Sequence, residues 1–208
     1  MKSFVEEGPS YKEDRIRAIT QMYYSRKDIQ KAIVSFSQGR ETVPRYFEGF
    51  GHRPDTLQYD SDLFQLVQKG ATSFHVSEEI WSDTLKLTRE STKEDLDKLR
   101  IGWDLLIDID SKYIDYSKIA AKLILDVLKF HGIKNPRVKF SGSKGFHIII
   151  PWKAFPEEIN GVRTVLMFPE WPRIITLYLS KRIEKKLIDK VTELDNPVNK
   201  YIKDFEAS

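Results

Sequence analysis

Two aspartates at alternate positions of an apolar run are the residues in this sequence best suited to chemistry. Asp108 and Asp110 end the segment 103–110, which reads WDLLIDID and has the pattern of a β-strand. Successive strand side chains alternate, so both carboxylates project from one face, with Cα atoms about 6.5–7 Å apart. Such a pair can share Mg²⁺ or Mn²⁺, which also accept phosphate oxygens. The alternative is a strand end that carries two ordinary surface acids.

A second group of polar residues surrounds two glycines in the segment 140–147, which reads FSGSKGFH. The glycines let backbone amides approach an anion closely, and the side chains add hydroxyl donors, positive charge and an imidazole. This combination suits a triphosphate, with the following candidate ligands: Ser141, Ser143, Lys144 and His147. The alternative is a tight hairpin whose glycines serve only the turn.

The elements between the two motifs indicate how they meet. Residues 137–141 and 146–151 are β-rich and flank a short glycine-containing turn, which predicts a hairpin. An amphipathic helix precedes it; we expect Asp115 or Ser117 to cap its start and His131-Gly132 to end it. A helix of this length is suitable for a crossover, so the acids and the phosphate cradle are expected on adjacent strands.

The rest of the chain supplies further elements but no linker that would divide it. Helical spacing of apolar residues predicts two helices within 11–38, followed by a strand at 72–77 and a long helix at 173–191. We therefore expect a single domain over residues 1–208. Its three parts are an N-terminal helical and strand part, a motif-bearing sheet, and a loop with a C-terminal helix: 1–100, 101–151 and 152–208.

Composition restricts the class of protein. With 208 residues, 40% hydrophobic and 31% charged, the chain can bury a real core. A net charge of +3 means that any nucleic-acid surface must be local. The absence of cysteine excludes disulfides, thiolate zinc sites and cysteine nucleophiles, and indicates a reducing compartment. No segment has the roughly 20 apolar residues of a membrane span, so we expect a cytoplasmic protein with no membrane partner.

The two motifs, in this order and spacing, resemble the catalytic small subunit of archaeal and eukaryotic-type DNA primases, members of the primase-polymerase superfamily. The resemblance is specific from about 102 to 151 and extends weakly upstream. It implies an α+β chain of primase-polymerase type, with a mixed β-sheet flanked by helices. By position, Asp108 and Asp110 match the metal-binding acids of the family. The triphosphate-contacting residues are matched by Ser141, Ser143, Lys144 and His147.

The resemblance implies a nucleotidyltransferase that uses Mg²⁺ or Mn²⁺ to make short primers from nucleoside triphosphates on a single-stranded DNA template. Two features of the family are missing, namely its cysteine-rich zinc insertion and the arginine-rich stretch near its third metal-binding acid. Asp189 and Asp195 are weak candidates for that acid. The alternative function is therefore a non-catalytic or half-site subunit of a split primase. A primase large subunit or a complementary catalytic chain is the expected partner.

Other polar and aromatic residues leave two interpretations open. The last helix has cations that would either follow a nucleic-acid backbone or form a solvated face: Lys181, Arg182, Lys185, Lys186 and Lys190. The proline-rich segment before it has aromatic residues that would either stack on bases or pack in a loop: Trp152, Phe155, Phe168 and Trp171. We interpret His52 and His75 as structural, because neither has a partner at metal-ligand spacing.

Overall fold

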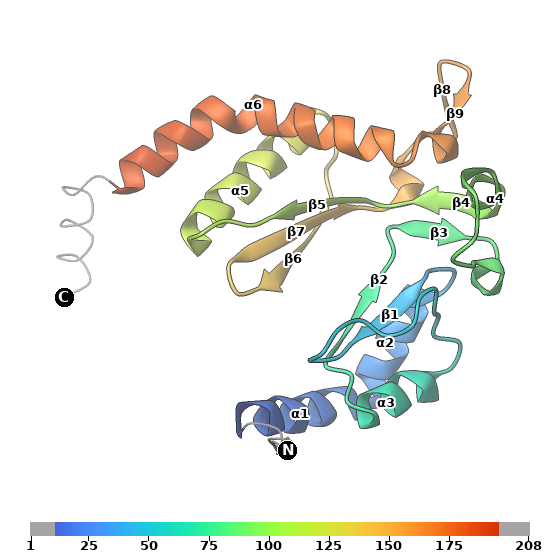
Figure 1. The fold of residues 1–208 in the computed structure, drawn as a ribbon. Helices are drawn as coiled ribbons and strands as arrows, with labels where there is room; N and C mark the ends of the chain where they lie inside the picture. Colours follow the sequence, from blue (N-terminus) through green and yellow to red (C-terminus); the bar gives the residue numbers. More distant parts are fainter. Residues whose placement is uncertain (1–10, 196–208) are drawn as a thin grey trace, which may run out of the picture. The chain divides into compact units, whose positions relative to one another are not determined.

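A computed structural model describes residues 11–195 of the chain, which divides between Gly102 and Trp103 into two compact units (Figure 1). Each unit has its own apolar core. The first unit contains the N-terminal helices and short strands, and the second contains both sequence motifs. The boundary lies close to the start of the motif-bearing segment expected from the sequence.

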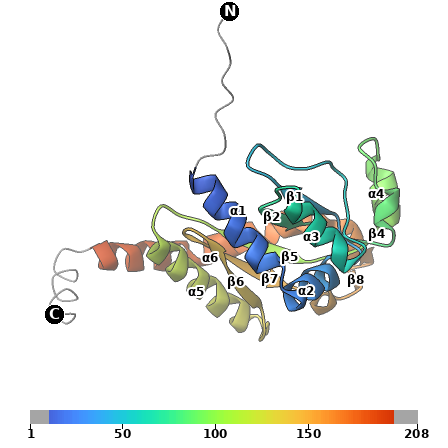
Figure 2. The ribbon, with the colours of Figure 1, turned by 90° about the horizontal axis from the view of Figure 1, so that it is seen from below.

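The first unit packs three helices beside a two-stranded antiparallel pair. Helices α1 (Tyr11–Tyr24), α2 (Lys27–Ser37) and α3 (Asp60–Gln68) contact one another, as both ribbon views show (Figures 1 and 2). Strand β1 (Thr42–Arg45) pairs with β2 (Ser73–Val76). The break between α1 and α2 and the strand near residue 74 confirm two sequence predictions.

A second strand pair completes this unit and leads to the next. Strand β3 (Glu79–Trp81) pairs with β4 (Arg100–Trp103), and the short helix α4 (Lys93–Leu99) lies between them in sequence. Arg100 is buried and forms ion pairs with Glu79 and Asp97. Burial raises the pKa of Glu79, although the neighbouring guanidinium acts in the opposite direction. The pair of arginine and acids therefore ties β3 to the end of α4.

The second unit is built on a three-stranded antiparallel sheet in the order β5-β7-β6. Strand β5 (Leu105–Ile109) is followed by helix α5 (Ile114–Phe130) and by the hairpin of β6 (Arg137–Gly142) and β7 (Gly145–Ile150). Both β5 and β6 pair with β7 in antiparallel register, so β5 and β6 run in the same direction on either side of it. The hairpin expected from the sequence is confirmed.

Helices α5 and α6 (Glu170–Asp195) lie on one side of this sheet (Figure 1). The sheet gives the core Leu105, Ile107, Ile109, Ile148 and Ile150, and the helices add Ala121, Leu123, Ile124, Leu128, Leu179 and Ile183. Burying these side chains stabilises the unit by about 25 cal/mol per Å² of apolar surface removed from water. This packing uses one face of the sheet, and the side chains that alternate with these residues along the strands lie on the other face.

Two helix boundaries differ from the sequence predictions. Helix α5 begins at Ile114, so Asp115 and Ser117 lie within its first turn and neither caps it; the prediction was wrong there. Helix α6 runs over 170–195 and is longer than the predicted 173–191. Its start includes Pro172, which the first turn of a helix tolerates because the N–H there needs no intrahelical partner.

The segment between β7 and α6 wraps around Trp103. This segment contains two short helical turns (Trp152–Ala154 and Thr164–Met167) and the small β8–β9 hairpin (Glu158–Ile159 and Val162–Arg163). The Trp103 ring is fully buried and lies 4.7–6.2 Å, centroid to centroid, from the rings of Trp152, Phe155 and Phe168. Trp171 also packs against this core. These four side chains are partly buried against the core, which favours the interpretation that they pack within the protein.

Polar groups anchor the same segment. The indole Nε1 of Trp103 donates a hydrogen bond to the carbonyl of Thr164 at 3.0 Å, and the backbone N–H of Trp152 donates to Asp104 Oδ1 at 2.8 Å.

Within residues 11–195, no helix has the length and apolar character that crossing a membrane requires.

We expect Trp103→Ala to lower the free energy of unfolding by about 3–5 kcal/mol, because it removes the ring that three aromatic side chains contact and leaves a cavity. Urea denaturation followed by circular dichroism measures this change. Phe130→Ala is the control, since that ring is 78% exposed and its loss is expected to change stability by no more than about 0.5 kcal/mol. Equal effects of the two substitutions would contradict the packing role of Trp103.

Candidate nucleotide and metal site

Asp108 and Asp110 lie on the sheet face opposite helices α5 and α6. Ile107 and Ile109 are buried against those helices, whereas both aspartates are exposed, so the alternation predicted from the sequence is present. The exposed fraction of the Asp108 side chain is 65%. Both carboxylates are therefore accessible to a ligand from solvent.

Strand register brings the two sequence motifs together at Asp108 and His147. The two residues are directly opposite in the β5–β7 pair, and His147 Nε2 lies 3.4 Å from Asp108 Oδ1. Side chains directly opposite on paired strands share one face. One residue of each motif thus lies on adjacent strands, as expected, while β6 with Ser141 is separated from β5 by β7.

The loop after β5 orients Asp110. The backbone N–H of Ser111 donates to Asp110 Oδ1 at 2.9 Å. The Ser111 hydroxyl in turn lies 2.8 Å from the hydroxyl of Ser117, which is fully buried in α5, and also donates to the Tyr113 carbonyl. Ser117, expected to be a cap, therefore serves to hold the loop that follows the second acid.

Gly145 begins β7 at a point where a side chain would collide with the site. A Cβ atom placed on it would lie 2.5 Å from Ser141 Oγ, 3.0 Å from the Ile109 carbonyl oxygen and 3.6 Å from Asp110 Oδ1. Ser141, Asp110 and the end of β5 therefore surround a small space that only glycine leaves open. Because both distances are measured from the same Cβ position, the Ser141 hydroxyl and the Asp110 carboxylate lie close to each other.

The two-residue turn of the hairpin consists of Ser143 and Lys144. Gly142 and Gly145 pair across its base, and Ser143 has a φ of 54°, a left-handed backbone that fits a tight turn. Ser143 and Lys144 are exposed. They lie at the tip, while the other candidates, Ser141 and His147, lie on the strands next to the acids.

A groove of about 700 Å³ runs along the outer edge of β5, between this strand and α5 and α6. Its lining includes both aspartates together with Lys181 and Glu184 of α6. Among residues 11–195 no strand pairs with this edge of β5. Sequence reasoning placed Lys181 among the helix cations and did not single out Glu184; no local pattern indicates that either faces the groove.

The weak candidates for a third acid do not line this groove within the described residues. Asp189 is exposed on α6, and Ile188 beside it contributes to the lining instead. The side chain of Asp195 lies outside the part of the chain that the structure describes. Neither Asp189 nor Asp195 is thereby linked to Asp108 and Asp110, whereas Glu184 of α6 lines the same groove as both of them.

The donor set fits a hard divalent cation in part. Two accessible carboxylates are the oxygen ligands that Mg²⁺ and Mn²⁺ prefer, and these ions keep several waters or accept phosphate oxygens at the remaining positions. The described residues contain no cluster of three or more His, Asp, Cys or Glu side chains placed to hold a metal. A substrate phosphate, or an acid from elsewhere, is needed to complete such a site.

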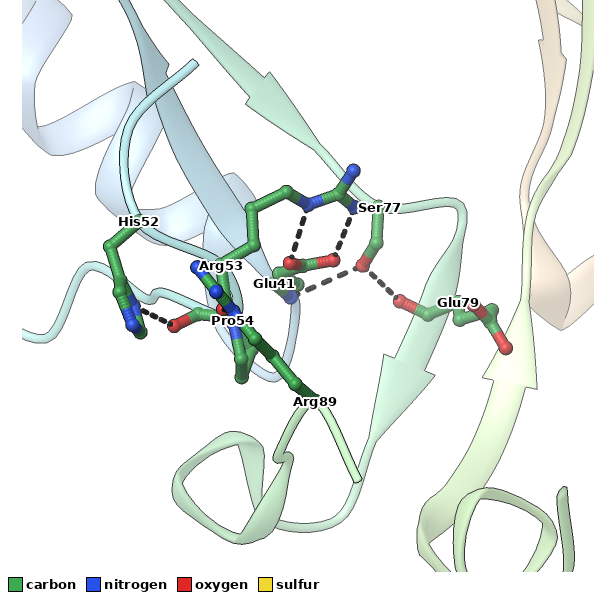
Figure 3. Close-up of polar contacts among 7 residues, drawn as sticks. All are labelled: Glu41, His52, Arg53, Pro54, Ser77, Glu79 and Arg89. Carbon is green, nitrogen blue, oxygen red and sulfur yellow. Dashed lines mark hydrogen bonds and ion pairs between the residues drawn. The ribbon is translucent and has the colours of Figure 1, made fainter. Parts of the chain in front are cut away.

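A polar cluster in the first unit is satisfied by its own members (Figure 3). Arg53 donates two hydrogen bonds to Glu41, at 3.0 and 2.9 Å, and this carboxylate raises the pKa of the guanidinium. Ser77 and Arg89 bond to backbone atoms around the pair, and His52 Nδ1 lies 3.3 Å from the Pro54 carbonyl. His75 packs its ring against Phe50. These contacts support the structural interpretation of both histidines.

Comparisons with known proteins find similarity both in sequence and in structure. The chain is 41% identical over 90 residues to the uncharacterised protein MJECS07 of Methanocaldococcus jannaschii, a stretch that covers 43% of this chain and 19% of that protein. It superposes on the polymerase domain of Mycobacterium tuberculosis ligase D, solved in complex with DNA, with a TM-score of 0.54 and 18% identity. That match covers 82% of this chain and 63% of the other. No family model matches the sequence.

The structural match establishes the fold. The chain is an α+β protein, as the sequence predicted, and it shares the fold of this polymerase domain. The chain spans less than two thirds of the length of either similar protein. Activity, substrates and partners therefore do not follow from the fold.

We expect Gly145→Ala to weaken binding of a nucleoside triphosphate at least tenfold, because the new methyl group must displace the Ser141 hydroxyl or the carbonyl at the end of β5. Gly49→Ala is the control, since its backbone is not left-handed and a Cβ atom there would meet only Arg45 Nη1, at an ordinary contact distance of 3.8 Å. Titration with a labelled nucleotide measures both affinities. Unchanged binding by the Gly145 variant would remove Ser141 from the site.

Proposed function

We propose that this chain is a template-directed nucleotidyltransferase that makes short primers on single-stranded DNA, as a DNA primase small subunit does. The observation that carries the proposal is the pairing of Asp108 with His147, which puts one candidate from each motif side by side on the same sheet face. Neither motif alone points as strongly to phosphoryl transfer, because acids on strands and glycine hairpins are both common.

Each group on this face has a role in the proposed reaction. Asp108 and Asp110 hold Mg²⁺ or Mn²⁺, which when bound neutralises charge on the phosphates and activates the primer hydroxyl. The phosphates of the incoming nucleotide are bound by Ser141, Ser143, Lys144 and His147. Lysine acts as a point charge, and the glycines let backbone approach the anion. These residues orient the α-phosphorus for in-line attack, so the protein contributes mainly position and electrostatics.

Nucleic acid as the template is supported by the fold. The similar polymerase domain of ligase D was solved in complex with DNA. The net charge of this chain is only +3, so the proposal requires a local cationic surface rather than a generally basic protein.

A second candidate function is favoured by one specific feature of the site. Residues 11–195 provide only two clustered carboxylates, and the adjacent edge of β5 is unpaired within that range. A half-site subunit of a split primase would have this arrangement, with a further acid supplied by a complementary catalytic chain or with activity dependent on a large subunit. An unpaired strand edge next to a groove is a surface on which another strand can be added.

We expect Asp108→Asn and Asp110→Asn each to reduce nucleotide transfer to background while leaving the fold intact, because each change removes a metal ligand without altering side-chain size. Stability in the absence of metal is expected to be unchanged or slightly higher, since repulsion between two like charges is relieved. A primer-synthesis assay with labelled nucleotides measures the first effect, and thermal unfolding the second.

Asp126→Asn is the matched control, because this aspartate is exposed on α5, the layer that covers the other sheet face. It is expected to retain full activity. Normal activity in the Asp108 variant would refute the catalytic assignment.

The two candidate functions differ in the activity of the isolated chain. If the site is a half-site, we expect the purified chain to make almost no primers and to become active when the partner chain is added. The reason is that two carboxylates alone fix two ions poorly at a working separation. Efficient synthesis by the chain alone would instead mean that its own residues, such as Asp189 or Asp195, complete the site.

A further inference from the structure

The open sheet face has an ordered distribution of charge across its three strands. Asp108 on β5 is directly opposite His147 on β7, which is directly opposite Lys139 on β6. The next row in the direction away from the hairpin turn consists of Leu106, Ile149 and Arg137. Residues in one row share a face of the sheet. Acids therefore occupy the β5 side of this face and cations occupy the β6 side.

The two cations of β6 are accessible and have no recorded partner. Every residue of β6 is exposed. Within residues 11–195 the structure shows no side-chain hydrogen bond or ion pair for Arg137 or Lys139, whereas Arg26, Arg53 and Arg100 all pair with acids. Neighbouring strands lie about 4.8 Å apart, so β6 is roughly 10 Å from β5, and no ion pair joins its two cations to Asp108 or Asp110 in the described residues.

The position of these cations distinguishes them from the triphosphate cradle. Lys144 and Ser143 are at the turn, while Arg137 is at the opposite end of β6, five residues before the end of the strand at Gly142. A strand rises about 3.3 Å per residue, so Arg137 and the turn are separated by roughly 17–20 Å. A single triphosphate held at the turn does not extend over that length, whereas a polymer of phosphates does.

We propose that Arg137 and Lys139 form a strip on β6 that binds the phosphodiester backbone of the nucleic-acid strand on which the proposed site acts. The inference rests on the proposed function, because it takes the strand to lie across the same face as Asp108 and His147. Alternate positions of one strand present both cations to the same side, as a polyanion that follows β6 requires. Leu106 and Ile149, half-buried between the strip and the acids, give the same face an apolar surface.

A structural role would also account for cations on this strand. Charged side chains on an edge strand prevent pairing with other molecules, and β6 is an edge of its sheet. Such protection predicts that removal of the cations affects aggregation and leaves ligand affinity unchanged, so the two explanations are separable by measurement.

The test compares the double variant Arg137→Ala/Lys139→Ala with the wild-type chain in binding a fluorescent single-stranded oligonucleotide over a range of salt concentrations. We expect affinity at low salt to fall at least tenfold. The slope of log affinity against log salt is expected to decrease by about 1.4, because each lost phosphate contact on a single strand contributes about 0.7. Affinity for a nucleoside triphosphate, measured in parallel, is expected to stay within twofold of wild type.

Lys122→Ala/Lys129→Ala is the matched control. Both lysines are exposed on α5, so the net charge changes equally while the open sheet face is untouched. The proposal predicts a wild-type salt slope for this control. It also predicts that Lys139→Arg retains most of the affinity that Lys139→Ala loses.

Three outcomes would overturn the strip. These are an unchanged salt slope in the β6 variant, an equal loss in the α5 control, or a loss confined to triphosphate binding. Primer synthesis by the wild-type chain, measured with saturating oligonucleotide, tests the proposed function separately from the strip. If primers are made but the β6 variant keeps the wild-type salt slope, only the strip is refuted. If the β6 variant shows the expected loss of strand binding but the wild-type chain makes no primers, only the proposed catalysis is refuted.

Discussion

The antiparallel pairing of β5 with β7 is the constraint on which the candidate site depends. Its register is held by apolar side chains, since Ile107 is opposite Ile148 and both are buried under the helices. A slip of one residue would turn these side chains into solvent and the polar ones into the core, at a large cost in buried apolar surface. The packing of the core therefore fixes the position of Asp108 opposite His147. Chemistry on one face of the sheet is specified by hydrophobic burial on the other.

Local contacts refine the geometry that the register establishes. Asp110 lies beyond the last residue of β5, where pairing no longer holds the backbone, and the Ser111–Ser117 hydrogen bond ties this loop to the buried side of α5. Gly145 admits the Ser141 hydroxyl to the same place because it has no side chain. In the first unit, by contrast, Glu41 and Arg53 satisfy each other through two hydrogen bonds.

The two edges of the three-stranded sheet have opposite character. The β5 edge borders a groove and acids, whereas β6 is fully exposed and cationic. The central strand β7, whose only ionisable side chain is His147, separates them, so the aspartates of the β5 side and the cations of β6 lie on opposite sides of the sheet. Such separation suits a substrate that brings both metal ions and phosphates, since the acids can hold the ions while cations meet the phosphates.

The sequence by itself determined the elements and the chemical types of the site residues. The alternation around Ile107 and Asp108 and the two glycines of the hairpin are local patterns, so β5, the β6–β7 hairpin and the face of the aspartates were predictable. The true start of α5 was missed because Tyr113 has no capping side chain, and Ser117 has a tertiary partner instead. Only the tertiary structure decided which strands are neighbours, that Trp103 collects the later aromatic residues, and that Lys139 shares a row with His147 and Asp108. Those relations join residues distant in sequence, and they arise from packing and strand register, which no local pattern contains.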